Sequence, residues 1–208
     1  MKYLITVFLT VLLIITSPLA SGSAEHSKVV PLKEGVLLAA SPKLEDPNFI
    51  HTVILLVSYG KEGALGLIIN RPSGIDLKQL FPYIEGFEKG VFHVYLGGPV
   101  ERNTMSVLFT TDTAPKGALK VLEGLYFTYD KDVLVPVLQN QEPKNKTRVY
   151  AGFASWAHGQ LEQEIIHGAW VTMEANQDTV FTENPLRIWP SIFPIPADDN
   201  LVQLIRTQ

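Results

Sequence analysis

The sequence contains no cysteine among its 208 residues. This absence excludes disulfide bonds, thiolate metal sites, a cysteine nucleophile and a lipid anchor attached to cysteine. Charged residues are also scarce, at 18%, against about 25% in an average globular protein. Because hydrophobic residues make up 46% of the chain, the composition excludes a disordered protein and predicts one globular domain.

Familiar catalytic patterns are missing as well. The chain has neither a Gly-x-Ser-x-Gly nucleophile elbow nor a Gly-x-x-x-x-Gly-Lys phosphate loop. His158 and Glu162 are spaced i, i+4, which suits either a metal or acid/base face or a solvated helix face; there is no His-Glu-x-x-His pattern. We therefore predict no catalytic residue, no metal and no cofactor, and whether the protein is an enzyme stays open, with a non-enzyme favoured.

The N-terminus has the layout of a secretory signal peptide. Lys2 precedes an apolar stretch, Pro18 breaks it, and small residues follow up to Ala24. We predict a signal peptide at 1–24, a flexible lead at 25–34 and a single domain at 35–208 that ends in a Pro-rich tail. The predicted location is periplasmic or secreted. The alternative is a membrane anchor formed by uncleaved residues 3–20, which would be the chain's contact with a membrane.

The net charge of the chain limits the kinds of partner that it can attract. It is −4 for the whole chain, and cleavage after Ala24 removes Lys2 alone and leaves −5. An acidic protein gains nothing from the charge of polyphosphates, so we expect no nucleic-acid partner.

The stretch Gly63 to Pro72 organises the chain. Its apolar run predicts a strand buried on both faces. Pro72 cannot donate to a sheet ladder, so pairing should stop there and leave Asn70 and Arg71 at a sheet end. These two residues then either cap the strand or line a site.

Alternation of apolar and polar residues predicts a mixture of strands and short helices. The strand at 52–59 and the central run should form an antiparallel hairpin, because about four residues containing glycine join them. Asp76 and Asp130 are predicted helix caps, and Pro136 weakens the second helix. Expected strands lie at 35–40, 52–59, 63–69, 91–96, 105–110, 124–128, 149–153 and 169–174, the last ending at 180–181; expected helices lie at 76–81, 130–138, 159–168 and 184–189, followed by an extended tail with Pro190, Pro194 and Pro196.

An ordered set of short motifs carries a family resemblance. The motifs are Gly-Val-Leu-Leu-Ala-Ala-Ser-Pro at 35–42, Thr-Val-Ile-Leu-Leu at 52–56, the stretch 63–72, Gly-Gly-Pro-Val at 97–100, Gly-Phe-Ala-Ser-Trp-Ala-His-Gly-Gln-Leu-Glu at 152–162 and Gly-Ala-Trp at 168–170. This set resembles the YqgE/AlgH family of bacterial proteins, from Gly35 to about Ile192. The resemblance implies an α/β (α+β) fold, in which a bent mixed sheet closes into a partial barrel with short helices packed outside.

The family has no established biochemical activity, and one member's name comes from a proposed role in transcriptional control of an exopolysaccharide. The chain departs from the family at several positions. Tyr59 and Phe109 stand where family members commonly carry histidine, and Phe153 and Ser155 replace the usual tyrosine and glycine. The signal peptide is a further departure, because the family is mostly cytoplasmic.

Five residues at predicted strand ends and helix starts are the candidate ligand-binding set: Asn70, Arg71, Trp156, Gln160 and Glu164. Asp46 is a further candidate. A sheet that curls toward closure would bring Asn70, Arg71, Trp156 and Gln160 to one concave mouth. The predicted function is a non-catalytic module that binds a small anionic ligand or a protein partner. The alternatives are a transcriptional regulator, from the family name, and a hydrolase-type enzyme with an unrecognised site.

Overall fold

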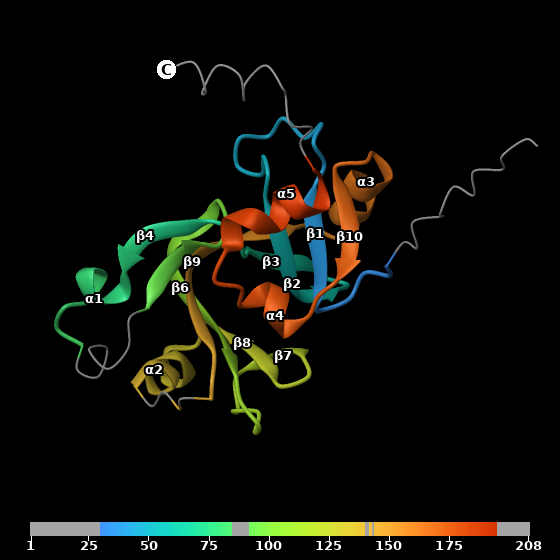
Figure 1. Ribbon diagram of the computed structural model, residues 1–208. Coiled ribbons are helices and arrows are strands. Elements are labelled where there is room, and N and C mark those ends of the chain that lie inside the picture. Colours follow the sequence, from blue (N-terminus) through green and yellow to red (C-terminus); the bar gives the residue numbers. More distant parts are fainter. Residues whose placement is uncertain (1–29, 85–91, 140–141, 143, 195–208) are drawn as a thin grey trace, which may run out of the picture.

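The computed structural model describes residues 30–84, 92–139, 142 and 144–194 (Figure 1). The predicted signal peptide, residues 1–24, and the end of the predicted tail, residues 195–208, lie outside the described residues. No helix within the described part of the chain is long and apolar enough to cross a membrane.

The fold is a mixed α+β arrangement of one large, mainly antiparallel sheet and short helices. The strands are β1 (Val36–Ala40), β2 (Val53–Gly60), β3 (Gly63–Ile68), β4 (Pro72–Asp76), β5 (His93–Leu96), β6 (Val100–Thr110), β7 (Leu119–Leu122), β8 (Leu125–Thr128), β9 (Thr147–Trp156) and β10 (Trp170–Glu174). The helices are α1 (Leu77–Leu80), α2 (Lys131–Gln139), α3 (Gln160–Ile166), α4 (Gln177–Val180), the 3-10 turn η2 (Pro185–Arg187) and α5 (Ile188–Ile192).

The sheet follows the order β10-β1-β2-β3-β9-β6-β8-β7, and β5 joins it beside β9 with β4 on its other side. The predicted hairpin of β2 and β3 is confirmed as an antiparallel pair. The pairing of β5 with β9 is parallel. Strand β9 is therefore shared by the two halves of the sheet, since its first part pairs with β5 and β6 and its last part pairs with β3.

Gly152 marks the change of partners in the middle of β9. Its φ is +70°, a left-handed conformation that glycine adopts without strain. A Cβ atom at this position would lie 2.7 Å from the Gly98 carbonyl oxygen and 2.8 Å from that of Val100. A side chain therefore does not fit, and the glycine lets β9 bend while the 98–100 backbone crosses it closely.

Both faces of the central strands are buried, as the sequence predicts. In β3 and just beyond it, Leu67 and Ile69 pack into one cluster, with Trp189 of α5, while Ala64 and Ile68 pack into another, with Leu161 of α3. This alternation follows the two-residue period of a strand. A third cluster lies under α1 and α2.

The sheet is bent but does not close into a barrel, which corrects the expectation of a partial barrel. Its terminal strands, β10 and β7, share no backbone ladder in the described part of the chain. Strand β7 approaches the other end of the sheet without forming a ladder: Val121 packs in the same cluster as Leu37 of β1, and a Cβ at Gly35 would lie 2.7 Å from the Val121 carbonyl oxygen. Side-chain packing covers the core here, so backbone closure is not required.

Three local predictions are wrong. Pro72 does not stop pairing: β3 has already ended, and Pro72 begins β4 opposite Tyr95, at a first-strand position where proline is tolerated. The predicted strand end at 180–181 is instead the end of the helix α4, which Asn176 caps by accepting a bond from Thr179 N at 2.8 Å. Pro190 lies inside α5 and not in an extended tail.

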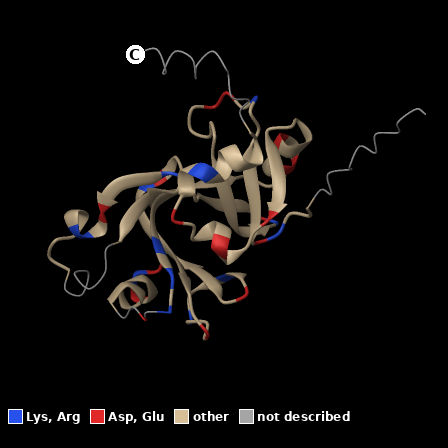
Figure 2. Cartoon of the chain, in the orientation of Figure 1, with Lys and Arg blue, Asp and Glu red and all other residues tan. Residues whose placement is uncertain are grey.

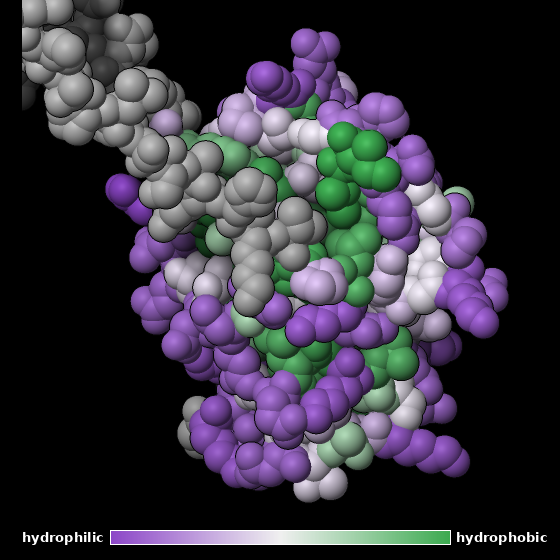
Figure 3. Space-filling view, turned by 90° about the vertical axis from the view of Figure 1, so that its right-hand side faces the viewer, coloured by the Kyte–Doolittle hydropathy of each residue, from purple (hydrophilic) through white to green (hydrophobic). Residues whose placement is uncertain are grey.

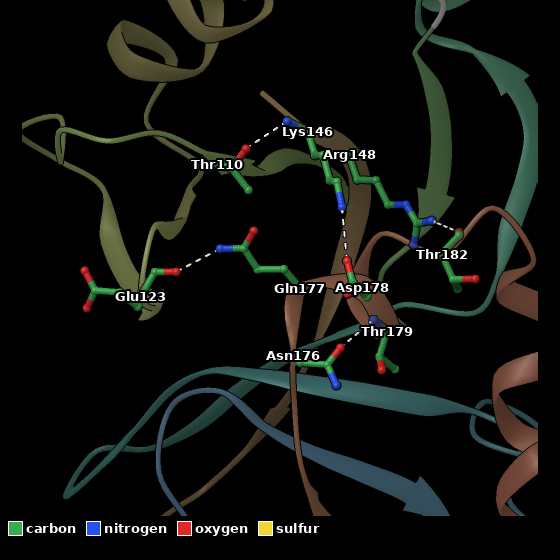
Figure 4. Close-up of polar contacts among 9 residues, drawn as sticks. All are labelled: Thr110, Glu123, Lys146, Arg148, Asn176, Gln177, Asp178, Thr179 and Thr182. Carbon is green, nitrogen blue, oxygen red and sulfur yellow. Dashed lines mark hydrogen bonds and ion pairs between the residues drawn. The ribbon is translucent and has the colours of Figure 1, made fainter. Parts of the chain in front are cut away.

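Helix α4 is fixed by polar contacts to the turn between β7 and β8 and to the residue before β9 (Figure 4). Gln177 donates to the Glu123 carbonyl at 2.8 Å, and Lys146 forms an ion pair with Asp178 at 3.4 Å. The buried guanidinium of Arg148 points at the same segment and donates to the Val180 and Thr182 carbonyls. The guanidinium also lies over the Tyr95 ring, 4.6 Å from its centroid. Arg148 thus joins β9 to the chain after α4.

The described part of the predicted flexible lead, residues 30–34, contacts the sheet. Val30 N donates to Thr172 Oγ1 at 3.2 Å, Glu34 accepts from Tyr59 N at 3.1 Å, and Lys33 pairs with Glu174 at 3.5 Å.

Figure 3, seen from the side of α3 and β10, shows apolar surface among polar side chains. Ile166 of α3 is 73% exposed and is one of the exposed hydrophobic residues of the domain.

Candidate functional site

Asn70 shapes the corner that follows β3. Its side chain is buried, its Oδ1 accepts from Val53 N at 2.8 Å, and its Nδ2 donates to the His51 carbonyl at 2.9 Å. His51 has a φ of +56°, an uncommon conformation for a residue other than glycine. Asn70 therefore holds the turn before β2 with both ends of its amide, and it also lines a hollow that His51 and Arg71 share.

Arg71 is the next residue and is only partly buried. Its guanidinium donates to the Asn48 carbonyl at 2.8 Å, and its own carbonyl accepts from Leu96 N at 2.9 Å. Asp46 shapes the facing turn, because its Oδ1 accepts from Asn48 N at 2.8 Å. Most of the five N–H groups of the guanidinium therefore have no hydrogen-bond partner among the residues that the structure describes.

A second arginine reaches the same place from the start of β6. The Gly97-Gly98-Pro99 loop crosses β9 so closely that a Cβ on Gly98 would lie 2.1 Å from the Phe153 carbonyl carbon. The chain then passes through Glu101, with a φ of +45°, to the exposed Arg102. Together these segments form the Arg71 pocket, a hollow of about 160 Å³ lined by Asn48, Arg71, Leu96, Gly98, Pro99, Arg102 and Ala151.

The charged side chains that line the Arg71 pocket are both positive. Neither Arg71 nor Arg102 forms an ion pair with a carboxylate of residues 30–84, 92–139, 142 or 144–194. Burial lowers the pKa of Arg71 below its ordinary value, although a guanidinium stays protonated at neutral pH. A partly desolvated cation gains stability from an anion, and guanidinium geometry matches carboxylate and phosphate oxygens.

The other three predicted site residues form a separate cluster, the Glu164 cluster, made of Trp156, Gln160, Glu164 and Trp170. Glu164 Oε2 accepts from the indole N–H groups of Trp156 at 2.8 Å and Trp170 at 2.7 Å. Its Oε1 accepts from Gln160 Nε2 at 2.9 Å, and Gln160 Oε1 accepts from Ala157 N at 3.1 Å. Each polar group of the cluster has a partner inside the protein, and the cluster fixes α3 to β9 and β10.

The structure does not bring the two groups of predicted site residues together. Trp156 pairs with Ala64 at the beginning of β3, whereas Asn70 and Arg71 follow the end of that strand. At about 3.3 Å per residue, the strand between them separates the groups by roughly 20 Å. The expected shared mouth is therefore wrong, because it depended on closure of the sheet.

Tyr59 and Phe109, which stand where the resemblance places histidines, have different surroundings. The Tyr59 hydroxyl donates to Glu162 Oε1 at 2.5 Å. That hydrogen bond raises the pKa of Tyr59, and it lowers the pKa of Glu162. Phe109 is buried and packs with Tyr126 in the cluster under α2. The i, i+4 spacing of His158 and Glu162 brings the two close enough for the histidine to contribute to the lowered pKa of Glu162.

Sequence reasoning missed Arg102 and Trp189. Arg102 lies 31 positions after Arg71, and only the pairing of β5 with β9 and the crossing of the Gly-Gly-Pro loop bring the two together. The presence of an arginine just after Gly-Gly-Pro-Val was the signal that could have found it. Nothing in the sequence indicates that Trp189 lines a hollow together with Arg71 and His51.

Comparisons with known proteins agree on one family. The family described as AlgH-like matches residues 37–194. The UPF0301 protein CT0663 of Chlorobaculum tepidum is 37% identical over 159 residues, which covers 76% of this chain and 83% of that protein. The UPF0301 protein of Myxococcus xanthus is also 37% identical over 159 residues, covering 74% and 84%.

Two solved structures share the fold. The solution structure of the AlgH protein from Pseudomonas aeruginosa has a TM-score of 0.62 and 31% identity, and the match covers 84% of this chain and 93% of that one. The crystal structure of protein DIP2367 from Corynebacterium diphtheriae has a TM-score of 0.66 with 21% identity, covering 80% and 90%. The second likeness is one of fold alone.

Proposed function

The chain belongs to the AlgH-like family, and from that premise we propose that it is a non-catalytic binding module that recognises an anionic group in the Arg71 pocket. The observation that carries this proposal is the pair of arginines, Arg71 and Arg102, lining one hollow without a carboxylate from the described residues. A carboxylate or phosphate of a ligand supplies the missing charge. Gly98 and Pro99 line the same hollow beside the two arginines.

Charge distribution supports a small or local partner over a nucleic acid. Basic and acidic residues are interspersed along the chain in Figure 2, and no strand or helix is uniformly basic in that view. The net charge of −4 opposes binding to a polyphosphate. Two arginines in one hollow recognise a single anionic group, and they do not form the basic stripe that a DNA backbone requires.

The test is a titration of the ¹⁵N-labelled protein with acetate and with inorganic phosphate, followed by backbone amide shifts. We expect saturable shifts at Arg71, Gly97 and Gly98. Arg102→Gln should weaken the binding of whichever anion binds by at least tenfold, because it removes one of the two positive charges of the protein that face the anion. Lys61→Gln, an exposed change in the turn at the far end of β3, is the matched control and should bind normally. Unchanged binding by Arg102→Gln would contradict the proposal.

We also propose that the protein works outside the cytoplasm. The support is the sequence pattern of residues 1–24, with a charged start, an apolar stretch and a small-residue exit. Intact-mass measurement after cell fractionation should find a periplasmic or secreted protein that begins near Ser23 or Glu25. Recovery of the uncleaved chain from the membrane would favour the anchor formed by residues 3–20, and recovery of it from the cytoplasm would contradict export.

A further inference from the structure

A second hollow adjoins the Arg71 pocket. It has a volume of about 310 Å³ and includes Ile50, His51, Leu186 and Trp189 in its lining, and we call it the Trp189 pocket. Arg71 lines both hollows. The turn at 48–51 also contributes to both, with Asn48 on one side and Ile50 and His51 on the other. A molecule bound at Arg71 therefore has the second hollow as its nearest neighbour.

The Trp189 pocket offers apolar and aromatic surface. Trp189 is buried, its indole N–H donates to the Ala40 carbonyl at 2.7 Å, and the residue lines the pocket. The His51 ring packs on it with centroids 4.1 Å apart. Leu186 is 68% exposed and Ile50 is 40% exposed, which leaves two aliphatic side chains in solvent beside the aromatic pair.

The geometry of the turn holds this wall in place. His51 has the left-handed φ of +56°, and the buried Asn70 bonds its carbonyl. A non-glycine residue in this conformation costs free energy and persists where its surroundings enforce it; such residues concentrate at binding sites. The same Asn70 precedes Arg71, so one buried side chain sets the positions of both the cation and the aromatic wall.

Size separates the roles of the two hollows. Sites for small molecules are about 300 to 1,000 Å³ in volume. The Arg71 pocket alone, at about 160 Å³, is below that range and accommodates a headgroup, whereas the two hollows together fall inside it.

We infer that the ligand of this site is a small organic anion, whose anionic group binds Arg71 and Arg102 while its apolar body lies in the Trp189 pocket against Leu186 and Trp189. This inference rests on the proposed function and adds the class of ligand. The site selects such a ligand at both ends. Burial in the Trp189 pocket favours the apolar body of the ligand, and the guanidinium groups favour its anionic group.

Three probes test the inference on the ¹⁵N-labelled protein: acetate, 3-phenylpropionate and the uncharged 3-phenylpropionamide. We expect 3-phenylpropionate to bind at least tenfold more tightly than acetate and at least tenfold more tightly than the amide. Its shifts should include the Trp189 indole N–H and the Leu186 amide in addition to Gly98. Acetate should shift Gly98 and leave the Leu186 amide unmoved.

Matched variants separate this inference from the proposed function. Leu186→Gln should reduce the advantage of 3-phenylpropionate over acetate at least threefold and leave acetate binding unchanged. Leu119→Gln is the control, because Leu119 is 47% exposed on β7 and lines neither hollow. Equal affinity for acetate and 3-phenylpropionate, with Arg102→Gln still weakening both, overturns the inference and leaves the proposed function standing. Binding of 3-phenylpropionate that Arg102→Gln does not weaken overturns the proposed function.

Discussion

The Glu164 cluster and the Arg71 pocket use their charged side chains in opposite ways. In the cluster, one carboxylate accepts two indole N–H groups and an amide N–H, so its hydrogen-bonding capacity is used within the protein. In the pocket, two guanidinium groups face a hollow, and the one hydrogen bond that Arg71 makes there goes to a backbone carbonyl. The cluster holds α3 against the sheet, whereas the guanidinium groups of the pocket have N–H groups that can bind a ligand.

The comparison shows why a polar motif is not by itself a site. Trp156 and Gln160 lie in the longest family motif, residues 152–162, Glu164 follows it, and the three side chains bond one another. Arg102 lies outside the family motifs, two residues after Gly-Gly-Pro-Val, and it lines the pocket. The measure of a binding site is the hydrogen-bonding and charge capacity that the fold leaves unsatisfied.

The largest expected effect is on stability, at the Glu164 cluster. Glu164→Ala leaves the N–H groups of Trp156 and Trp170 without an acceptor, and buried donors without partners cost about 1–3 kcal/mol each. We expect a loss of about 2–4 kcal/mol in the free energy of unfolding, measured by urea denaturation. Gln163→Ala, an exposed change on the same helix, is the control and should cost less than about 0.5 kcal/mol. A small effect of Glu164→Ala would contradict the structural role of the cluster.

Asn70→Ala should have the next largest effect and should affect both stability and binding. The change removes the acceptor of Val53 N and the donor to the His51 carbonyl, which is expected to cost about 1–3 kcal/mol. Because the turn at 48–51 also lines the pocket, acetate binding should weaken in the variant while it is still folded. If Asn70→Ala melts earlier but binds acetate as the wild type does, then Asn70 does not position the site.

A smaller, pH-dependent effect is expected where α3 meets β2. The hydrogen bond from Tyr59 lowers the pKa of Glu162 below its ordinary value in the folded state. Its contribution is therefore fully present above the unfolded-state pKa and is lost as the pH falls through the lower folded-state pKa. The stability difference between the wild type and Tyr59→Phe, from urea denaturation, should be present at pH 7 and shrink at about pH 3. Solvent exposure keeps the difference small, and a difference that grows in acid would contradict the assignment.

The smallest effect on stability is expected at the pocket itself. Arg102 is exposed and forms no ion pair with the described residues, so Arg102→Gln should change the free energy of unfolding by less than about 0.5 kcal/mol. Loss of anion binding with unchanged stability is the reverse of the result expected for Glu164→Ala. A loss of stability comparable to that of Glu164→Ala would show that Arg102 has a structural role.

Local patterns in the sequence were sufficient for most of the elements. The hairpin of β2 and β3 follows from apolar runs around a glycine-containing turn, and the caps Asp76 and Asp130 precede α1 and α2 as predicted. Strand β7, Leu119–Leu122, was missed because Val121 alone of its four residues is buried, and its pairing with β8 holds it in the sheet. Helix α4 was missed because packing and the bonds of Gln177 and Asp178 hold a single turn that has little helix propensity of its own.

The sequence by itself determined the family, through its ordered set of motifs. It also determined the mixed α+β character and the buried central strand, because these depend on the order and period of apolar residues. It also placed Arg71 at the end of β3. Tertiary structure alone decided that Arg102 lies beside Arg71, that Trp189 lines the adjoining hollow, and that Glu164 is fully used in holding α3. These facts depend on contacts between segments distant in sequence, set by the bend of β9 at Gly152 and the open ends of the sheet. No local pattern encodes such contacts, since the residues on each side fit many partners until the sheet order fixes one.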